Sequence, residues 1–143
     1  MPRLHGRRRF AGVIHRRGDA KQPYFGALGR GAVYPAYHVV AGLTRAAGAA
    51  LVATSSSDAS RVRSLAYRAN DATLLWLANM TAQDQSVGVT HSGAAPFGMV
   101  IDEKSFERAT SEPAAFQAEV KPLDTSRLVL RAYAVALICI NDR

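Results

Sequence analysis

Length, composition and charge already exclude several classes of protein. The chain has 143 residues, 48% of them apolar and 20% charged, with a formal net charge of +7. This size allows one domain with a sizeable core and not two large ones, and the composition is that of a globular chain, not a disordered one. No apolar run approaches the about 18 residues of a membrane span, so we expect a cytoplasmic protein that does not enter a membrane.

The positive charge is confined to the first thirty residues, which hold eight Lys and Arg against one acid, Asp19. Such an arm can bind nucleic acid through its phosphates, but Arg7-Arg8-Arg9 lacks a neighbouring aromatic platform, and basic arms are commonly only solvated. We therefore keep nucleic-acid binding as a less favoured alternative, and the role of the Arg-rich residues 1–17 stays open. The apolar run Ala11 to Ile14 is too short for an export signal.

The predicted elements begin with a helix from Pro35 to Gly48, because proline suits a first helical turn and glycine a helix end. A change to alternating and apolar runs then predicts strands at 50–54, 62–68, 72–79, 86–90, 96–101, 128–130 and 133–140. The run 72–79 is apolar on both faces, as in a central strand. Residues 102–124 are expected to be a polar excursion anchored by Phe106 and Phe116, with no helix between the strands.

This order predicts a mainly β fold, an antiparallel β-sandwich of about seven strands preceded by one α-helix. We assign residues 1–48 to a basic arm, a loop and the helix, and residues 49–143 to the sandwich domain. The side chains expected inside are Leu51, Val62, Leu65, Leu75, Leu77, Val87, Val129, Val135 and Leu137.

Four motifs occur in order along the chain: VYPAYHVVAGL (33–43), SSDASRVRSLAYR (56–68), LLWLANMTAQDQSVGV (74–89) and LVLRAYAVALICI (128–140). Together they resemble the C-terminal part of the D-apionate lactonases, which are bacterial sugar-catabolic enzymes with a glycoside-hydrolase-like barrel and a C-terminal β-sandwich. The resemblance runs from about Gly12 to Ile140. The segment Met1–Phe10 departs from the family, which would have barrel sequence there.

The resemblance implies that the first helix corresponds to the last helix of a TIM barrel. A full barrel needs roughly 250 residues, so we expect this chain to be a hydrolase fragment that carries only its final piece. Its expected partners are a catalytic barrel domain, or a second copy bound through an exposed face of the helix.

The sequence offers no evident catalytic machinery. Glycosidase-like barrels use a pair of carboxylates, and the barrel-like residues 1–48 hold only Asp19. The four histidines and the single Cys139 show no metal-ligand spacing, and the Asn79-Met80-Thr81 sequon is interpreted as chance. We expect no catalytic residue, cofactor or metal, and a chain that is not an enzyme by itself.

Four aromatic or imidazole side chains leave alternatives open. His38 beside Tyr37 could act as a base or ligand, but we interpret both as interface residues where the helix meets the sandwich. Trp76 and Tyr133 could stack a sugar, but core positions are favoured. The favoured function is therefore a packing and stabilising domain of a carbohydrate-catabolic enzyme, and the alternative is a stand-alone carbohydrate-binding module.

Overall fold

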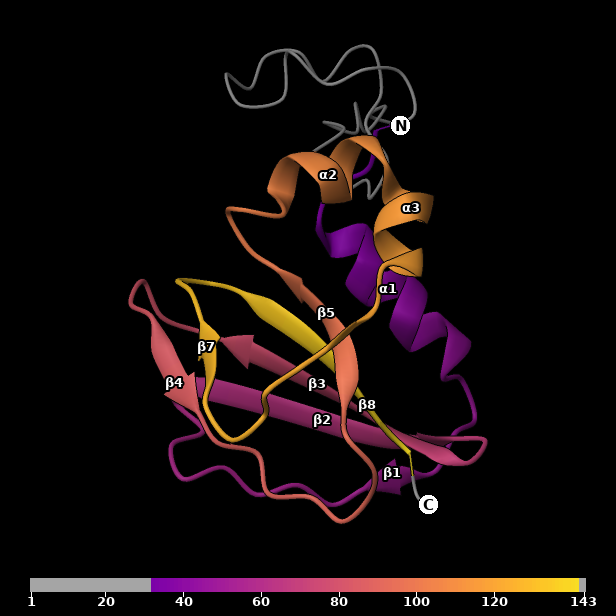
Figure 1. The fold of residues 1–143 in the computed structure, drawn as a ribbon, viewed down its shortest axis with the longest axis vertical. Helices are drawn as coiled ribbons and strands as arrows, with labels where there is room; N and C mark the ends of the chain where they lie inside the picture. The colour runs from indigo at the N-terminus through magenta and orange to yellow at the C-terminus, as the bar shows by residue number, and fades with distance from the viewer. Residues whose placement is uncertain (1–31, 142–143) are drawn as a thin grey trace, which may run out of the picture.

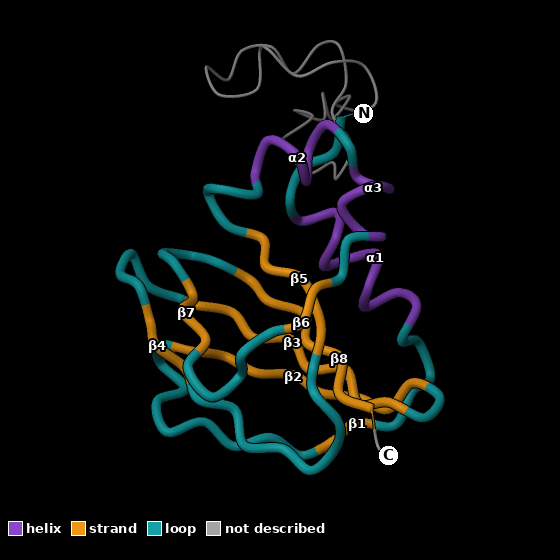
Figure 2. Tube along the Cα trace, viewed as in Figure 1, coloured by secondary structure: helices purple, strands orange, loops and turns teal. Residues whose placement is uncertain are grey.

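The structure is a computed structural model and describes residues 32–141, which form three layers. Three helices lie on one side of a six-stranded sheet, and a two-stranded sheet lies on its other side (Figures 1 and 2). The arginine-rich arm predicted for residues 1–30 falls outside the described residues.

The seven predicted strands are present in the predicted order, and the structure adds one two-residue strand and two helices that were not predicted. The helices are α1 (Ala36–Arg45), α2 (Phe106–Ser111) and α3 (Pro113–Ala118). The strands are β1 (Leu51–Val52), β2 (Val62–Ala69), β3 (Ala72–Asn79), β4 (Gln85–Val87), β5 (Phe97–Ile101), β6 (Lys121–Pro122), β7 (Leu128–Leu130) and β8 (Val135–Asn141). The large sheet has the order β1-β2-β3-β8-β5-β6, the small one pairs β4 with β7, and every pairing is antiparallel. The predicted mainly β sandwich with a preceding helix is confirmed.

Strand β3 is central, and its side chains divide the core in two because successive residues point to opposite faces. Trp76 faces the helices with Tyr67, Met99 and Ile101, and these side chains pack with Ala109 of α2 and Phe116 of α3. Leu75 and Leu77 face the small sheet with Ala136 and Ile138, and these side chains pack with Leu130 of β7. A strand buried on both faces has no polar side to display, which explains its continuous apolar sequence.

The prediction of residues 102–124 as a polar loop without a helix is wrong, because α2 and α3 lie there. The Asp102 side chain accepts hydrogen bonds from the backbone N–H groups of Lys104 and Ser105 just before α2. Pro113 opens α3, a position where its missing N–H is not needed. Each helix has six residues, too few to show a helical period in the sequence.

Three predicted core residues lie at the surface: Leu51 is 75% exposed, Leu65 40% and Val129 53%. All three lie on strands, as predicted, but the sequence did not show that no other element covers these three side chains. Tyr133 is also wrong as a core residue, because it occupies a turn with φ of 56° and is 67% exposed. Leu75, Leu77 and Trp76 are buried as predicted.

Asn79 joins the two sheets from the end of β3, where it is 2% exposed. Its amide nitrogen lies 2.7 to 3.1 Å from the carbonyl oxygens of Gln83, Leu130 and Arg131, and its side-chain oxygen accepts bonds from Thr81. A buried side chain with this many polar partners fixes the turn after β3 against β7.

Candidate functional site

His38 lies at the contact between α1 and the other two helices and is 1% exposed. Its Nε2 is 2.7 Å from the carbonyl oxygen of Ala109, and its Nδ1 is 3.2 Å from the side-chain nitrogen of Gln117. Since a carbonyl only accepts and an amide NH₂ only donates, Nε2 carries the hydrogen and Nδ1 accepts. The Gln117 amide is oriented by Arg45, which donates to its oxygen at 3.2 Å.

Two aromatic rings enclose the same imidazole. Tyr37 and Phe116 meet His38 edge-on, with ring centroids 5.5 and 5.0 Å away. Both ring nitrogens of His38 are therefore engaged in joining α1 to α2 and α3, and neither is available to take a proton from a substrate. Among the described residues, no group of three or more His, Cys, Asp or Glu side chains could hold a metal ion.

Below His38, α1 contacts the sheet through Gly42. A methyl group added at this glycine would come within 2.4 Å of the Trp76 ring, so the absent side chain is what lets the helix lie so close. The Trp76 indole N–H donates to the Tyr67 hydroxyl at 3.3 Å, and that hydroxyl donates to the Gly42 carbonyl at 3.4 Å. We call the set His38, Gly42, Tyr67, Trp76 and Gln117 the helix junction.

The carboxylates of Asp58, Asp102, Glu103 and Asp124 serve local structure. The pKa of Asp58 is held below its ordinary value chiefly by the hydrogen bond from the Ser60 hydroxyl, and that of Asp124 chiefly by the bond from the Ser126 hydroxyl. Asp102 and Glu103 both pair with Arg131. A general acid needs a raised pKa, so the two lowered pKa values point away from that role.

Cys139 is half-buried, and desolvation raises the pKa of its thiol above the ordinary value. Because the thiolate is the reactive form, this environment does not favour a nucleophile.

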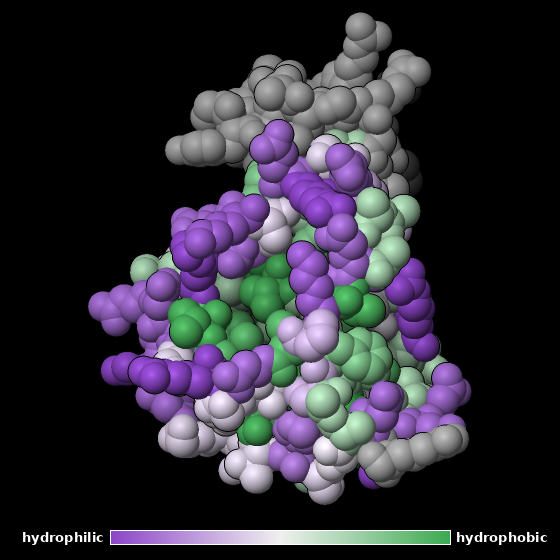
Figure 3. Space-filling model, viewed as in Figure 1, coloured by the Kyte–Doolittle hydropathy of each residue, from purple (hydrophilic) through white to green (hydrophobic). Residues whose placement is uncertain are grey.

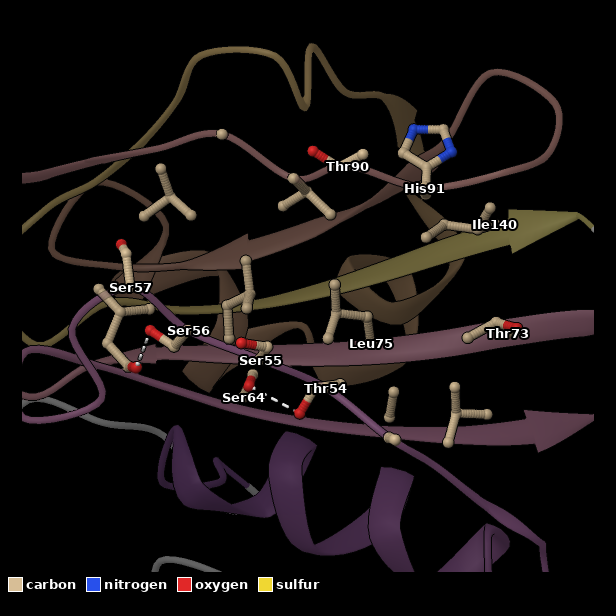
Figure 4. A pocket seen from close by; sticks show the side chains of 18 of the residues that line it. Thr54, Ser55, Ser56, Ser57, Ser64, Thr73, Leu75, Thr90, His91 and Ile140 are labelled. Atoms are coloured by element: carbon tan, nitrogen blue, oxygen red, sulfur yellow. Dashed lines mark hydrogen bonds between the residues drawn. The ribbon is translucent and has the colours of Figure 1, made fainter.

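A groove of about 620 Å³ opens on the opposite face of the sheet, away from the helices. Its two walls are the segment Val52–Asp58, which leads from β1 to β2, and residues 85–92, which contain β4. Figure 4 shows Thr90 and His91 on one side, Thr54 to Ser57 on the other, and Leu75 and Ile140 between them. We call this the serine groove. Sequence reasoning missed it, and the run Ser55-Ser56-Ser57 is the part of the sequence that could have indicated it.

Comparison with known proteins gives one family. Residues 59–138, more than half of the chain, match the D-apionate lactonase C-terminal immunoglobulin-like domain. No curated protein matches the chain. The match spans β2 to most of β8 and includes the walls of the serine groove from residue 85 onward, whereas α1 and β1 precede it. The antiparallel two-sheet arrangement agrees with this family, and the chain belongs to the C-terminal immunoglobulin-like domains of the D-apionate lactonases.

Proposed function

We propose that this chain is a non-catalytic packing domain of a carbohydrate-catabolic hydrolase, and that it stabilises a catalytic barrel by holding α1. The observation that carries this proposal is the helix junction. Helix α1 precedes the family match, yet it is fastened to the matched domain through Gly42 on Trp76 and His38 on Gln117. These contacts are expected of a helix that packs both on this domain and on a barrel that precedes it in the sequence.

Exposed apolar residues on α1 and on the helix-facing side of the large sheet support the presence of a partner on that side of the sheet. Val40 and Leu43 of α1 are 48% and 37% exposed. Leu65 and Leu51 lie on the helix-facing side of β2 and β1, since they pair with Trp76 and Tyr67 in the sheet register. We call these four residues the helix-side patch. Exposed apolar residues on the same side of a sheet can mark an interface.

The helix-side patch fits a barrel domain as its occupant. The family describes a C-terminal domain, so in its members other sequence precedes this one, and α1 with β1 lies on that N-terminal side. Figure 3 shows one face of the molecule, on which apolar side chains cover the middle and polar side chains border them. Within residues 32–141, no helix is long and apolar enough to cross a membrane.

The contacts around the candidate catalytic groups support a non-catalytic role. His38 uses both nitrogens to join helices, and Asp58 and Asp124 have lowered pKa values. We expect the purified chain to show no hydrolysis of D-apionolactone or aryl glycosides above background. Turnover that survives repurification and disappears in His38→Ala would contradict the proposal.

Light scattering tests the helix-side patch. An uncovered patch should make the chain associate as its concentration rises, and Leu65→Lys should reduce this association because it places a charge in the patch. Val129→Lys is the matched control, since Val129 is similarly exposed on β7 and lies on the other side of the sheet. A chain that stays monomeric at every concentration, or two variants that behave alike, would count against the patch as an interface.

A further inference from the structure

The serine groove exists because the second layer of the sandwich is small. Strands β4 and β7 have three residues each and lie over a sheet of six strands. The β2 side of that sheet is left without a covering strand, and the chain after β1 runs along it instead. The volume of the groove, about 620 Å³, is within the range of small-molecule sites.

Hydroxyl groups dominate the walls of the groove. Nine serine and threonine residues are among those that line it, including Thr54, Ser56, Ser57, Ser64 and Thr90. Some are engaged: Ser64 donates to Thr54 at 2.9 Å, and Ser56 donates to the Val62 carbonyl at 3.2 Å. Within residues 32–141, the hydroxyls of Ser57 and Thr90 make no hydrogen bond to another residue. Each can both donate to and accept from a ligand.

The floor of the groove is aliphatic. Ala66, Leu75, Leu77 and Ile140 contribute to it, and each is less than 10% exposed. A flat C–H surface of a ligand can rest on this floor while its polar groups reach the walls. The groove thus offers apolar contact below and hydrogen-bonding groups at its sides.

The charges of the groove are balanced at one end. Arg61 pairs with Asp58 at 3.3 Å, and Arg68 is also engaged in an interaction. An ionic ligand would have to compete with the Arg61–Asp58 pair for its counter-charge. A neutral ligand has no such competition.

We propose that the serine groove binds a neutral polyhydroxylated ligand, a saccharide, with its C–H face on the aliphatic floor and its hydroxyls on the serine and threonine walls. Among the residues that the structure describes, no Trp, Tyr or Phe lines the groove. Stacking on an aromatic ring therefore does not enter the proposal, and we expect a dissociation constant of about 1 mM or weaker. This inference does not depend on the packing role, because the groove and the helix junction lie on opposite faces.

His91 lies at the groove wall and is the residue whose ring we expect to contact the ligand. Its Nε2 is 3.2 Å from the Thr125 hydroxyl, while its Nδ1 is buried without a hydrogen-bond partner among the described residues. A buried unpaired nitrogen is unfavourable. A small turn of the ring toward a ligand hydroxyl in the groove would satisfy it, so binding and the pairing of Nδ1 are expected to occur together.

The experiment is a titration of the isotope-labelled chain with D-glucose, D-xylose and cellobiose, followed by amide chemical shifts. We expect saturable changes confined to the groove, at residues 52–58 and 85–92 of its walls and around Ala66, Leu75, Leu77 and Ile140 of its floor. The double variant Ser57→Ala with Thr90→Val should weaken binding by about fivefold or more, because two hydrogen bonds are lost. His91→Phe keeps the ring shape and should also weaken binding while leaving the folded chain intact.

Ser111→Ala is the matched control, since Ser111 lies on α2 and bonds only within its own helix. It should bind as the unaltered chain does. The inference is overturned if no saccharide gives saturable changes, if the changes spread equally to the helices, or if the Ser57 and Thr90 double variant binds with unchanged affinity. None of these results bears on the patch measured by light scattering.

Discussion

The two faces of the large sheet are covered by different means. On one face, α1 lies directly on Trp76 because Gly42 has no side chain, and hydrogen bonds link Trp76, Tyr67 and the helix backbone. On the other face, two three-residue strands cover part of the sheet and leave the serine groove beside them. One face is closed by close contact, and the other stays partly open.

The difference indicates a division of roles within one small domain. A close contact that depends on one glycine tolerates little change in shape, which suits a fixed interface. A groove whose walls are mainly loop residues, with the Ser57 and Thr90 hydroxyls unengaged, tolerates substitution and can adapt to a ligand. The predictions below test whether the two faces differ in this way.

The largest expected effect is on the partly open face, at its buried floor. Leu77→Ala should lower the free energy of unfolding by about 2–5 kcal/mol, because it leaves a cavity between the two sheets. Leu65→Ala is the control on the neighbouring strand; with its side chain 40% exposed, we expect a loss of about 0.5 kcal/mol. Chemical denaturation measures both, and similar losses would show that the core assignment of β3 is wrong.

The next effect concerns the helix-covered face. Alanine favours a helix over glycine by about 1 kcal/mol, yet Gly42→Ala should destabilise the chain by about 1–3 kcal/mol through overlap with Trp76. In combination with Trp76→Phe, the loss of stability should be smaller than the sum of the two single losses, because the smaller ring leaves room for the methyl group. Additive losses in the double-mutant cycle would show that the helix does not rest on this ring.

The smallest effect concerns the rim of the groove, where Asp58 accepts a hydrogen bond from Ser60. Its pKa is lowered in the folded state, so this carboxylate stabilises the fold above its unfolded pKa, and that contribution is lost as the pH falls through the lower folded pKa. Asp58→Asn should therefore be slightly less stable than the unaltered chain at neutral pH. The difference should begin to shrink below the ordinary carboxyl pKa of about 3.9 and disappear only once the pH is below the lowered pKa of the folded state, as measured by denaturation at neutral pH and across the acid range. A difference that persists in acid would exclude the carboxylate as its cause.

Much of the fold was predictable because it depends on local sequence signals. Pro35 and Gly48 bounded the first helix, and the structure has α1 at Ala36–Arg45 followed by a turn to Gly48 with φ of +83°. The apolar run of β3 predicted a strand covered on both faces, as found. These signals arise from backbone geometry and burial, which act over a few residues.

What could not be predicted depends on contacts between distant segments. Leu65 and Trp76 pair across β2 and β3, yet one is exposed and the other buried, because α1 covers only the latter. The serine groove likewise depends on residues 52–58 lying opposite residues 85–92. His38 was recognised as a candidate, but its partners Ala109 and Gln117 lie more than seventy residues away.

The burial of Asn79 has a consequence for the sequon Asn79-Met80-Thr81 when this protein is produced in a host that attaches N-linked glycans. In a eukaryotic secretory host, a glycan could be attached only while the Asn79 amide is accessible, and in the folded chain that amide is buried against three backbone carbonyls. A glycosylated molecule would then be one in which the turn after β3 had not closed on β7. The glycosylated fraction in such a host would measure how often the glycan is attached before the turn after β3 has folded against β7.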